Sequence, residues 1–178
     1  AYKESEFPAS TDERFRPVNA YTGPDGCLYI VDLYRGILQH KIYVTSYLRK
    51  QILRRGLDKP TGLGRIYRVV HESVKAGPKP NLSKASSREL VGHLSHPNGW
   101  WRDTAQRLLI EGGDSTVVPV IRKVAASGKS HLGRIHALWT LEGMDSIDIL
   151  TVLAAMKHPH PQVRIAAMRT GERLMKTD

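Results

Sequence analysis

The sequence contains a single cysteine, Cys27, among its 178 residues. An internal disulfide, a CxxC zinc pair and a CxxCH haem attachment site are therefore excluded within this chain. No apolar run reaches the roughly 18 residues of a membrane-spanning helix, and residues 1–20 lack the apolar stretch of a secretory leader. We therefore expect no membrane span and no signal peptide in this segment.

The residues that are present are typical of a basic globular protein. Hydrophobic residues make up 40% and charged residues 25% of the chain, and the net charge is +10. This balance fits phosphate-rich, acidic-protein or anionic-lipid partners without choosing among them. Residues 41–68 hold eight lysines and arginines against one acidic residue, Asp58. The chain begins at Ala1 rather than methionine, so we expect part of its function to lie outside it.

The first part of the chain, residues 1–76, is predicted to form a short antiparallel sheet. An extended run over 15–21, a turn over 23–26 and a strand over 27–31 predict a hairpin, and 64–70 predicts a returning strand. Between them, Thr45 or Ser46 is expected to cap a helix over 47–55 that stops at Gly56. Two prolines and a glycine at 77–81 predict a linker.

Residues 82–178 are predicted to be helical and repetitive. An arginine and an alanine recur 32 and 30 residues apart, each beside an apolar helix predicted over 89–94, 116–125 or 147–156. The recurring residues are Arg102, Arg134 and Arg164 with Ala105, Ala137 and Ala167. The alanine lets paired helices approach, and the arginine is placed to reach an acidic side chain or a turn carbonyl. Such helical pairs are typical of an α-solenoid, and they resemble about three HEAT-like repeats.

A second resemblance rests on residues 23–36, Gln39-His40 and residues 62–68. Their sequences GPDGCLYIVDLYRG and GLGRIYR are similar to the closing propeller blade of a membrane-bound dehydrogenase family of Planctomycetes and Verrucomicrobia. The resemblance covers about residues 13–70. It implies a β-propeller related to quinone-dependent sugar dehydrogenases, followed by HEAT-like repeats and often by a c-type cytochrome domain. The expected fold class is therefore α+β: a partial propeller blade followed by an all-α solenoid.

The resemblance also implies cofactors and a location for the parent protein. The parent would carry pyrroloquinoline quinone and haem c and would lie in the periplasm or cell envelope. This fragment is expected to hold neither cofactor by itself, because a propeller needs several blades around its axis and the haem motif is missing. We expect an oxidoreductase parent and a fragment that is inactive alone.

Two residues beyond the second predicted strand, Arg35 and His40, are the candidate cofactor-binding residues. A histidine beside an arginine can bind an anionic cofactor or take up a proton. The alternative is ordinary loop structure, in which Arg35 caps carbonyls and His40 makes a simple hydrogen bond. Asp32 could hold the Arg35 guanidinium in either case.

The predicted helix over 47–55 places Leu48 and Ile52 on a packing face and leaves Arg49, Lys50 and Arg54 available on another. The candidate partner-binding residues are these three and Arg55, at the end of the helix. Docking on an acidic partner domain, phosphate binding and a plain solvated face remain alternatives.

No catalytic residue and no metal site are predicted. His93 with His96, and His158 with His160, lack a cysteine or carboxylate that would complete a ligand set. The three tryptophans, Trp100, Trp101 and Trp139, are expected to pack in the core or between repeats.

The favoured function is a non-catalytic interaction or support fragment that contacts other domains of the parent or a partner protein. One alternative is part of the parent's cofactor or substrate pocket. Another is a basic HEAT-like nucleic-acid-binding module, although nucleic acid is not the expected partner. Asp103 beside Trp100 and Trp101 is the sole candidate for handling an extruded base. Exposed sheet edges are prone to pair with a second copy, so a homodimer is also an expectation.

Overall fold

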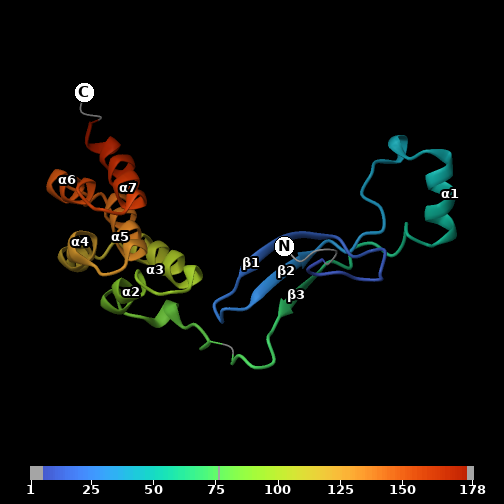
Figure 1. Cartoon of the computed structure of the whole chain (residues 1–178), viewed down its shortest axis with the longest axis horizontal. Coiled ribbons are helices and arrows are strands. Elements are labelled where there is room, and N and C mark those ends of the chain that lie inside the picture. The colour runs from blue at the N-terminus through green and yellow to red at the C-terminus, as the bar shows by residue number, and fades with distance from the viewer. Residues whose placement is uncertain (1–5, 76, 176–178) are drawn as a thin grey trace. The chain divides into compact units, whose positions relative to one another are not determined.

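The computed structural model of the protein describes residues 6–75 and 77–175. The chain divides into two compact units, Ala1–Gly23 with Cys27–Ala76 and Pro24–Gly26 with Gly77–Asp178. Within the described residues, the first unit holds the strands and helix α1, and the second holds helices α2 to α7 (Figure 1). The fold is α+β with an antiparallel sheet, as the sequence predicts.

The first unit is built on a sheet with the strand order β1–β2–β3. Strands β1 (Pro17–Thr22) and β2 (Leu28–Asp32) form the predicted hairpin, and β3 (Arg65–Val69) runs antiparallel along the other side of β2. Gly26 has a φ of 80°, a left-handed conformation that favours glycine in the turn. Among the described strands, β1 and β3 each pair with β2 alone, so both outer edges are open.

The two faces of this sheet are covered differently. On one face, buried Ile30 pairs in register with Tyr67, and the ring of Phe15 meets Tyr67 edge-on with centroids 5.9 Å apart. On the other face, Tyr21 is 59% exposed and Ile66 is 66% exposed. Because alternate residues point to the same side of a strand, this second face is continuous across the sheet. We call it the open sheet face, formed by Asn19, Tyr21, Tyr29, Val31, Ile66 and Arg68.

The chain between β2 and β3 makes the predicted helical excursion. A 3₁₀ turn over Lys41–Tyr43 precedes α1 (Ser46–Arg54). Of the two expected caps, Thr45 is the N-cap, and its hydroxyl accepts a hydrogen bond from the Leu48 amide at 3.3 Å. Gly56 follows the helix with a φ of 62°, which is the usual conformation of a glycine that ends a helix.

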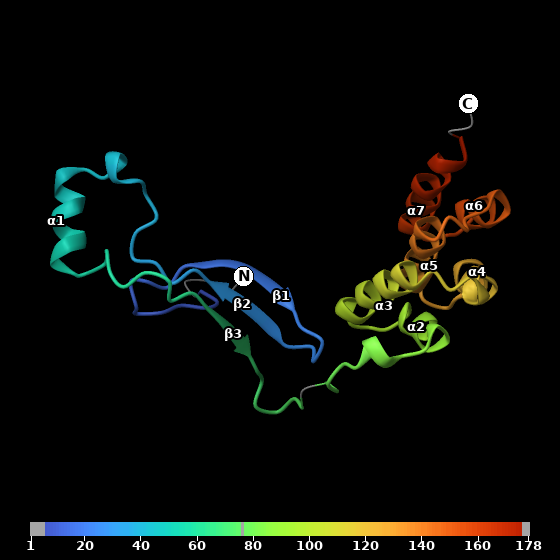
Figure 2. The ribbon, with the colours of Figure 1, turned by 180° about the vertical axis from the view of Figure 1, so that it is seen from behind.

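The second unit, over its described residues, consists of three helical pairs. The first helices are α2 (Ser87–His93), α4 (Val118–Ser127) and α6 (Ile149–Met156), and the second helices are α3 (Gly99–Gly112), α5 (His131–Gly143) and α7 (Pro161–Gly171). Helix α4 contacts α2 and α6, and helix α5 contacts α3 and α7. The first helices therefore form one layer and the second helices another (Figures 1 and 2). No helix in the described ranges is long and apolar enough to cross a bilayer.

The recurring arginine binds the turn between the two helices of each pair. Each of the three arginines donates hydrogen bonds of 2.6–3.0 Å to two carbonyl oxygens that precede it in the chain. The acceptors are His96 and Pro97 for Arg102, Ala126 and Gly128 for Arg134, and His158 and Pro159 for Arg164. The prediction that this arginine reaches a turn carbonyl is confirmed.

The recurring alanine lies where the helices pack most closely. Ala105, Ala137 and Ala167 are all fully buried and belong to one apolar cluster. Gly133, at the start of α5, is equally constrained because a Cβ there would overlap the side chain of Ser95. A protein interior has no free volume for a larger group at such points. Small residues therefore set the spacing between neighbouring helices.

Replacing Arg134 by methionine keeps an aliphatic stem but leaves the Ala126 and Gly128 carbonyls without their donor. Because hydrogen bonds from a charged group contribute about 1.5–3 kcal/mol, we expect the free energy of unfolding to fall by about 1–2 kcal/mol. Urea unfolding followed by tryptophan fluorescence measures this, since all three tryptophans lie in the helical unit. Arg169→Met, at an exposed position of α7, is the matched control and should cost less than about 0.5 kcal/mol. Equal small losses in both variants would contradict the role given to Arg134.

Candidate functional site

The Asp-x-Tyr segment at the end of β2 forms a hydrogen-bonded network. Asp32 is 1% exposed, and its Oδ1 accepts from the backbone amides of Arg16 at 2.8 Å and Tyr34 at 2.7 Å. Tyr34 has a φ of 47°, and its hydroxyl donates to Asp12 Oδ2 at 2.7 Å. The Arg65 guanidinium lies over the Tyr34 ring, 3.5 Å from the centroid. These contacts join the N-terminal segment, the end of β2 and the start of β3.

The network shifts the pKa of two of its members in opposite directions. The pKa of Asp12 is lowered because the Arg14 amide and the Tyr34 hydroxyl donate to its carboxylate. The pKa of Tyr34 is raised because ionisation would remove the hydrogen bond to Asp12. At neutral pH the Asp12 carboxylate is charged and the Tyr34 phenol is neutral. This favours a structural role, in which the hydrogen bond holds the two segments together, over proton transfer.

Arg35 and His40 both lie on the exposed loop that follows this network. The anticipated contact between Asp32 and the Arg35 guanidinium is not found among the described residues: Oδ1 accepts from two backbone amides, and the buried Oδ2 has no hydrogen-bond partner there. The His40 ring meets the Tyr43 ring edge-on, with centroids 6.4 Å apart. Neither Arg35 nor His40 lines the hollow that lies next to this loop.

That hollow has a volume of about 350 Å³ and lies between the loop and α1. Its lining residues are Glu13, Arg16, Gly36, Ile37, Gln39, Leu48, Ile52 and Leu57. Gly36 permits the close approach of the loop to Leu57, because a Cβ there would overlap the Leu57 backbone. Apolar walls with a few polar groups are general features of small-ligand sites. The sequence did not predict Arg16 and Gln39 as lining residues, because they come from separate segments that only the fold brings together. Gly36 was the one lining residue whose type could have indicated the site.

The basic residues of α1 are exposed, and they differ in how they are paired. Arg55 forms an ion pair with Glu13. Arg49, Lys50 and Arg54 have no carboxylate partner within the part of the chain that the structure describes. The same helix exposes apolar side chains, among them Tyr47 and Leu53. This surface is therefore both cationic and partly apolar.

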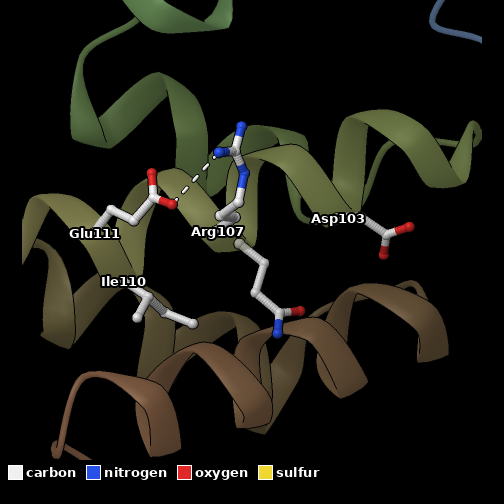
Figure 3. A pocket seen from close by; sticks show the side chains of 5 residues that line it. Asp103, Arg107, Ile110 and Glu111 are labelled. Carbon is white, nitrogen blue, oxygen red and sulfur yellow. Dashed lines mark hydrogen bonds and ion pairs between the residues drawn. The ribbon is translucent and has the colours of Figure 1, made fainter.

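In the second unit, a groove of about 360 Å³ runs along α3 (Figure 3). It is lined by Asp103, Gln106, Arg107, Ile110 and Glu111. Arg107 and Glu111 form an ion pair at 3.4 Å, and Asp103 lies apart from them in Figure 3. His136 of α5 contacts two lining residues: Nδ1 lies 2.7 Å from Gln106 Oε1, and Nε2 lies 3.8 Å from Asp103 Oδ1.

Burial controls the charge of His136. Its side chain is 15% exposed, and desolvation lowers its pKa. The charge of Asp103, whose side chain is 75% exposed and screened by water, opposes this shift without reversing it. A neutral imidazole can donate a hydrogen bond from Nδ1 to the Gln106 Oε1. The contact therefore joins α3 to α5 without a buried charge.

The tryptophans do not form an aromatic cleft beside Asp103. Trp101 is buried, and the rings of His93 and His96 each lie 5.0 Å from its ring, measured between centroids. Trp100 packs against the apolar cluster, which confirms the predicted packing role of this pair. His93 and His96 are therefore ring partners of Trp101. The described ranges contain no cluster of three potential metal ligands.

The other histidine pair lies at the start of α7. His160 stacks on His131 of α5 with centroids 4.0 Å apart and planes 12° apart, and the His160 amide donates to His158 Nδ1 at 3.1 Å. Desolvation and the nearby charge of Arg134 lower the pKa of His158. These rings therefore form a contact between α5 and α7.

Residues 1–73 match the family model of a domain of unknown function, DUF7133. The match covers the strands, the Asp32 network and α1, and it ends before the helical pairs. No curated protein and no solved structure matches the chain.

Acidification should destabilise the helical unit through His136 and His158. The pKa of each is lowered in the folded state, so the unfolded chain binds protons more readily. Stability is then complete above the ordinary histidine pKa of 6.5 and decreases as the pH falls below it. Urea midpoints at pH 7.5 and about pH 5.5, followed by tryptophan fluorescence, measure the effect, with these conditions chosen around that value.

His136→Gln should reduce this pH dependence. The matched control is His71→Gln in the first unit, which should leave it unchanged. A helical unit that becomes more stable on acidification would contradict the expected sign.

Proposed function

We propose that this chain is a non-catalytic interaction and support module of a larger protein. In this proposal the sheet unit is a partial β-propeller blade, and the helical unit is a HEAT-like solenoid of three pairs. The open sheet face carries the proposal, because Tyr21 and Ile66 are largely exposed on it.

The first unit has little apolar core of its own. Ile30 and Ile52 are the buried hydrophobic residues among its described positions, whereas many large apolar side chains are exposed. Three strands are the minimum for an independently stable sheet, and a large exposed apolar patch commonly marks a docking surface. Propeller blades contain four strands and pack beside other blades. A neighbouring sheet would cover the open face, and an added strand would complete one edge.

The helical unit supports the same role. Two layers of helices, repeated with the same arginine-to-turn contact, are characteristic of solenoids that present extended binding surfaces. The resemblance to the membrane-bound dehydrogenase family implies a parent in the periplasm or cell envelope. In this proposal the solenoid holds the propeller against a partner or electron-transfer domain. Pyrroloquinoline quinone and haem c would be held by other segments of the parent.

A thermal unfolding experiment tests the non-catalytic assignment. A ligand that binds the native state raises the unfolding midpoint. We expect pyrroloquinoline quinone with calcium to leave the midpoint of this chain unchanged. A rise that both Arg35→Ala and His40→Ala abolish would overturn the proposal and make the loop part of a cofactor pocket.

Self-association tests the docking role of the open sheet face. We expect the chain to associate at high concentration, and Tyr21→Lys combined with Ile66→Lys to weaken this association, because charge on an apolar face opposes its burial. Light scattering after size-exclusion chromatography measures the mass. Leu53→Lys, at an exposed position of α1, is the matched control. Association that persists in the double variant but is lost in the control would contradict the assignment.

A further inference from the structure

The third helical pair has an outer face of large apolar side chains. Six of them are between 40% and 75% exposed, on α6 and α7 together. We call them the outer face of the third pair: Ile149, Leu150, Leu153, Met156, Ile165 and Met168. Helix α6 has the sequence ILTVLAAM, with Thr151 as its one polar residue. A helix that is apolar on all sides normally lies in an interior.

Helix α5 shows what such a face packs against, because it lies between α3 and α7. Its stripe toward α7 is bounded by two contacts: His131 stacks on His160, and Glu142 pairs with Arg173 at 3.6 Å. Residues four, seven and eleven positions after His131 lie on the same side of a helix. Ile135 and Leu138 therefore also face α7.

The recurring arginine and alanine align α5 with α7 at an offset of 30 residues. Ile165 and Met168 then occupy the positions of Ile135 and Leu138, and Glu172 occupies the position of Glu142. In α5 the equivalent residues are covered: Leu138 is fully buried and Ile135 packs on the core. In α7, Ile165 is 49% exposed and Met168 is 50% exposed. The outer face of the third pair thus has the same pattern of residues as the surface of α5 that packs against α7.

The same alignment predicts which residues a helical partner would present to the outer face of the third pair. The stripe of α5 that faces α3 contains His136 and Gly143, which contact Gln106 and approach Ile110. The equivalent stripe of α7 consists of small buried residues, Val163, Ala166, Ala167 and Thr170, and Arg173 follows it in the 3₁₀ turn over Glu172–Met175. Small side chains therefore meet Ile135 and Leu138, and Arg173 pairs with Glu142 and Asp145.

We propose that the outer face of the third pair docks a further helical pair of the same repeat type. Its second helix presents small residues to Ile165 and Met168 and an arginine to Glu172. This partner continues the interface that α6 and α7 make with α4 and α5. A second copy of the chain fits less well, because two outer faces would set large side chains against large ones. The inference does not depend on the role proposed for the sheet unit.

A tandem duplication tests this proposal. Residues 146–175 span one 30-residue repeat, so a copy inserted directly after Met175 continues the array in register. The added pair should raise the thermal midpoint of the helical unit by about 4 °C or more, since neighbouring repeats stabilise one another. With leucine in place of each methionine of the copy, Met156 and Met168 of the original pair should oxidise more slowly in peroxide, as mapped by mass spectrometry, while Met144, already packed, serves as the internal reference.

Glu172→Arg, made in the duplicated chain and in the original chain, provides the matched control. It should remove part of the gain in the duplicated chain, where Glu172 has an arginine partner, and should change the original chain little. An unchanged midpoint together with unchanged oxidation of Met168 would overturn the proposal. Light scattering of the original chain tests whether a second copy occupies the outer face. A dimer in which Met168 is already protected would also overturn the proposal.

A peptide added in trans keeps the test decisive if the duplicated chain does not fold. The peptide comprises residues 146–175 with each methionine replaced by leucine, a substitution that helical packing tolerates. In excess over the unmodified chain, it should slow oxidation of Met168. Full reactivity of Met168 in a large excess of peptide would contradict docking of a helical pair.

Discussion

The helical unit depends on the hydrogen bonds from one arginine to the turn that precedes it. The last carbonyls of a helix have no partner within that helix. The Arg134 guanidinium donates to Ala126 in the last turn of α4, whereas Arg102 and Arg164 donate to carbonyls of the turn beyond α2 and α6. One side chain therefore holds the turn against the helix that follows it, and in the second pair it also caps the first helix. Repeated three times, this contact gives three pairs of similar geometry, whose small residues can stack in register.

The sheet unit is held together in a different way. Its buried polar centre is Asp32, which binds two backbone amides, and Tyr34 extends the network to Asp12 and Arg65. Such a clasp fixes chain segments with directional bonds, whereas an apolar core of this size would contribute little. The apolar side chains that are not used for a core remain on the surface. Docking is therefore the role that the chemistry of this unit favours.

Each unit leaves apolar surface uncovered, and the two surfaces select different partners. A sheet face and open strand edges accept another sheet or strand, through flat packing and backbone hydrogen bonds. The outer face of α6 and α7 accepts helices, because large side chains there match the small-residue stripe of a neighbouring pair. The cationic face of α1 adds a third kind of surface, with Arg49, Lys50 and Arg54 available to acidic groups.

Local signals in the sequence determined much of the fold. The glycine turn, the Thr45 cap and the end of α1 at Gly56 depend on nearby residues, so they were predictable from spacing and residue type. The recurring arginine and alanine were equally visible, and their contacts follow from position within a repeat.

Contacts between distant segments were decided by the tertiary structure. The sequence alone pointed to Arg35 for the Asp32 carboxylate, but strand pairing brings the Arg16 amide to it. Gln106 and His136 are 30 residues apart and meet because α3 packs on α5. The hollow beside α1 takes its polar lining from two segments, one with Glu13 and Arg16 and one with Gln39. Residue type and spacing thus determined which elements form, and packing between elements determined which side chains meet, because those distances depend on the whole chain.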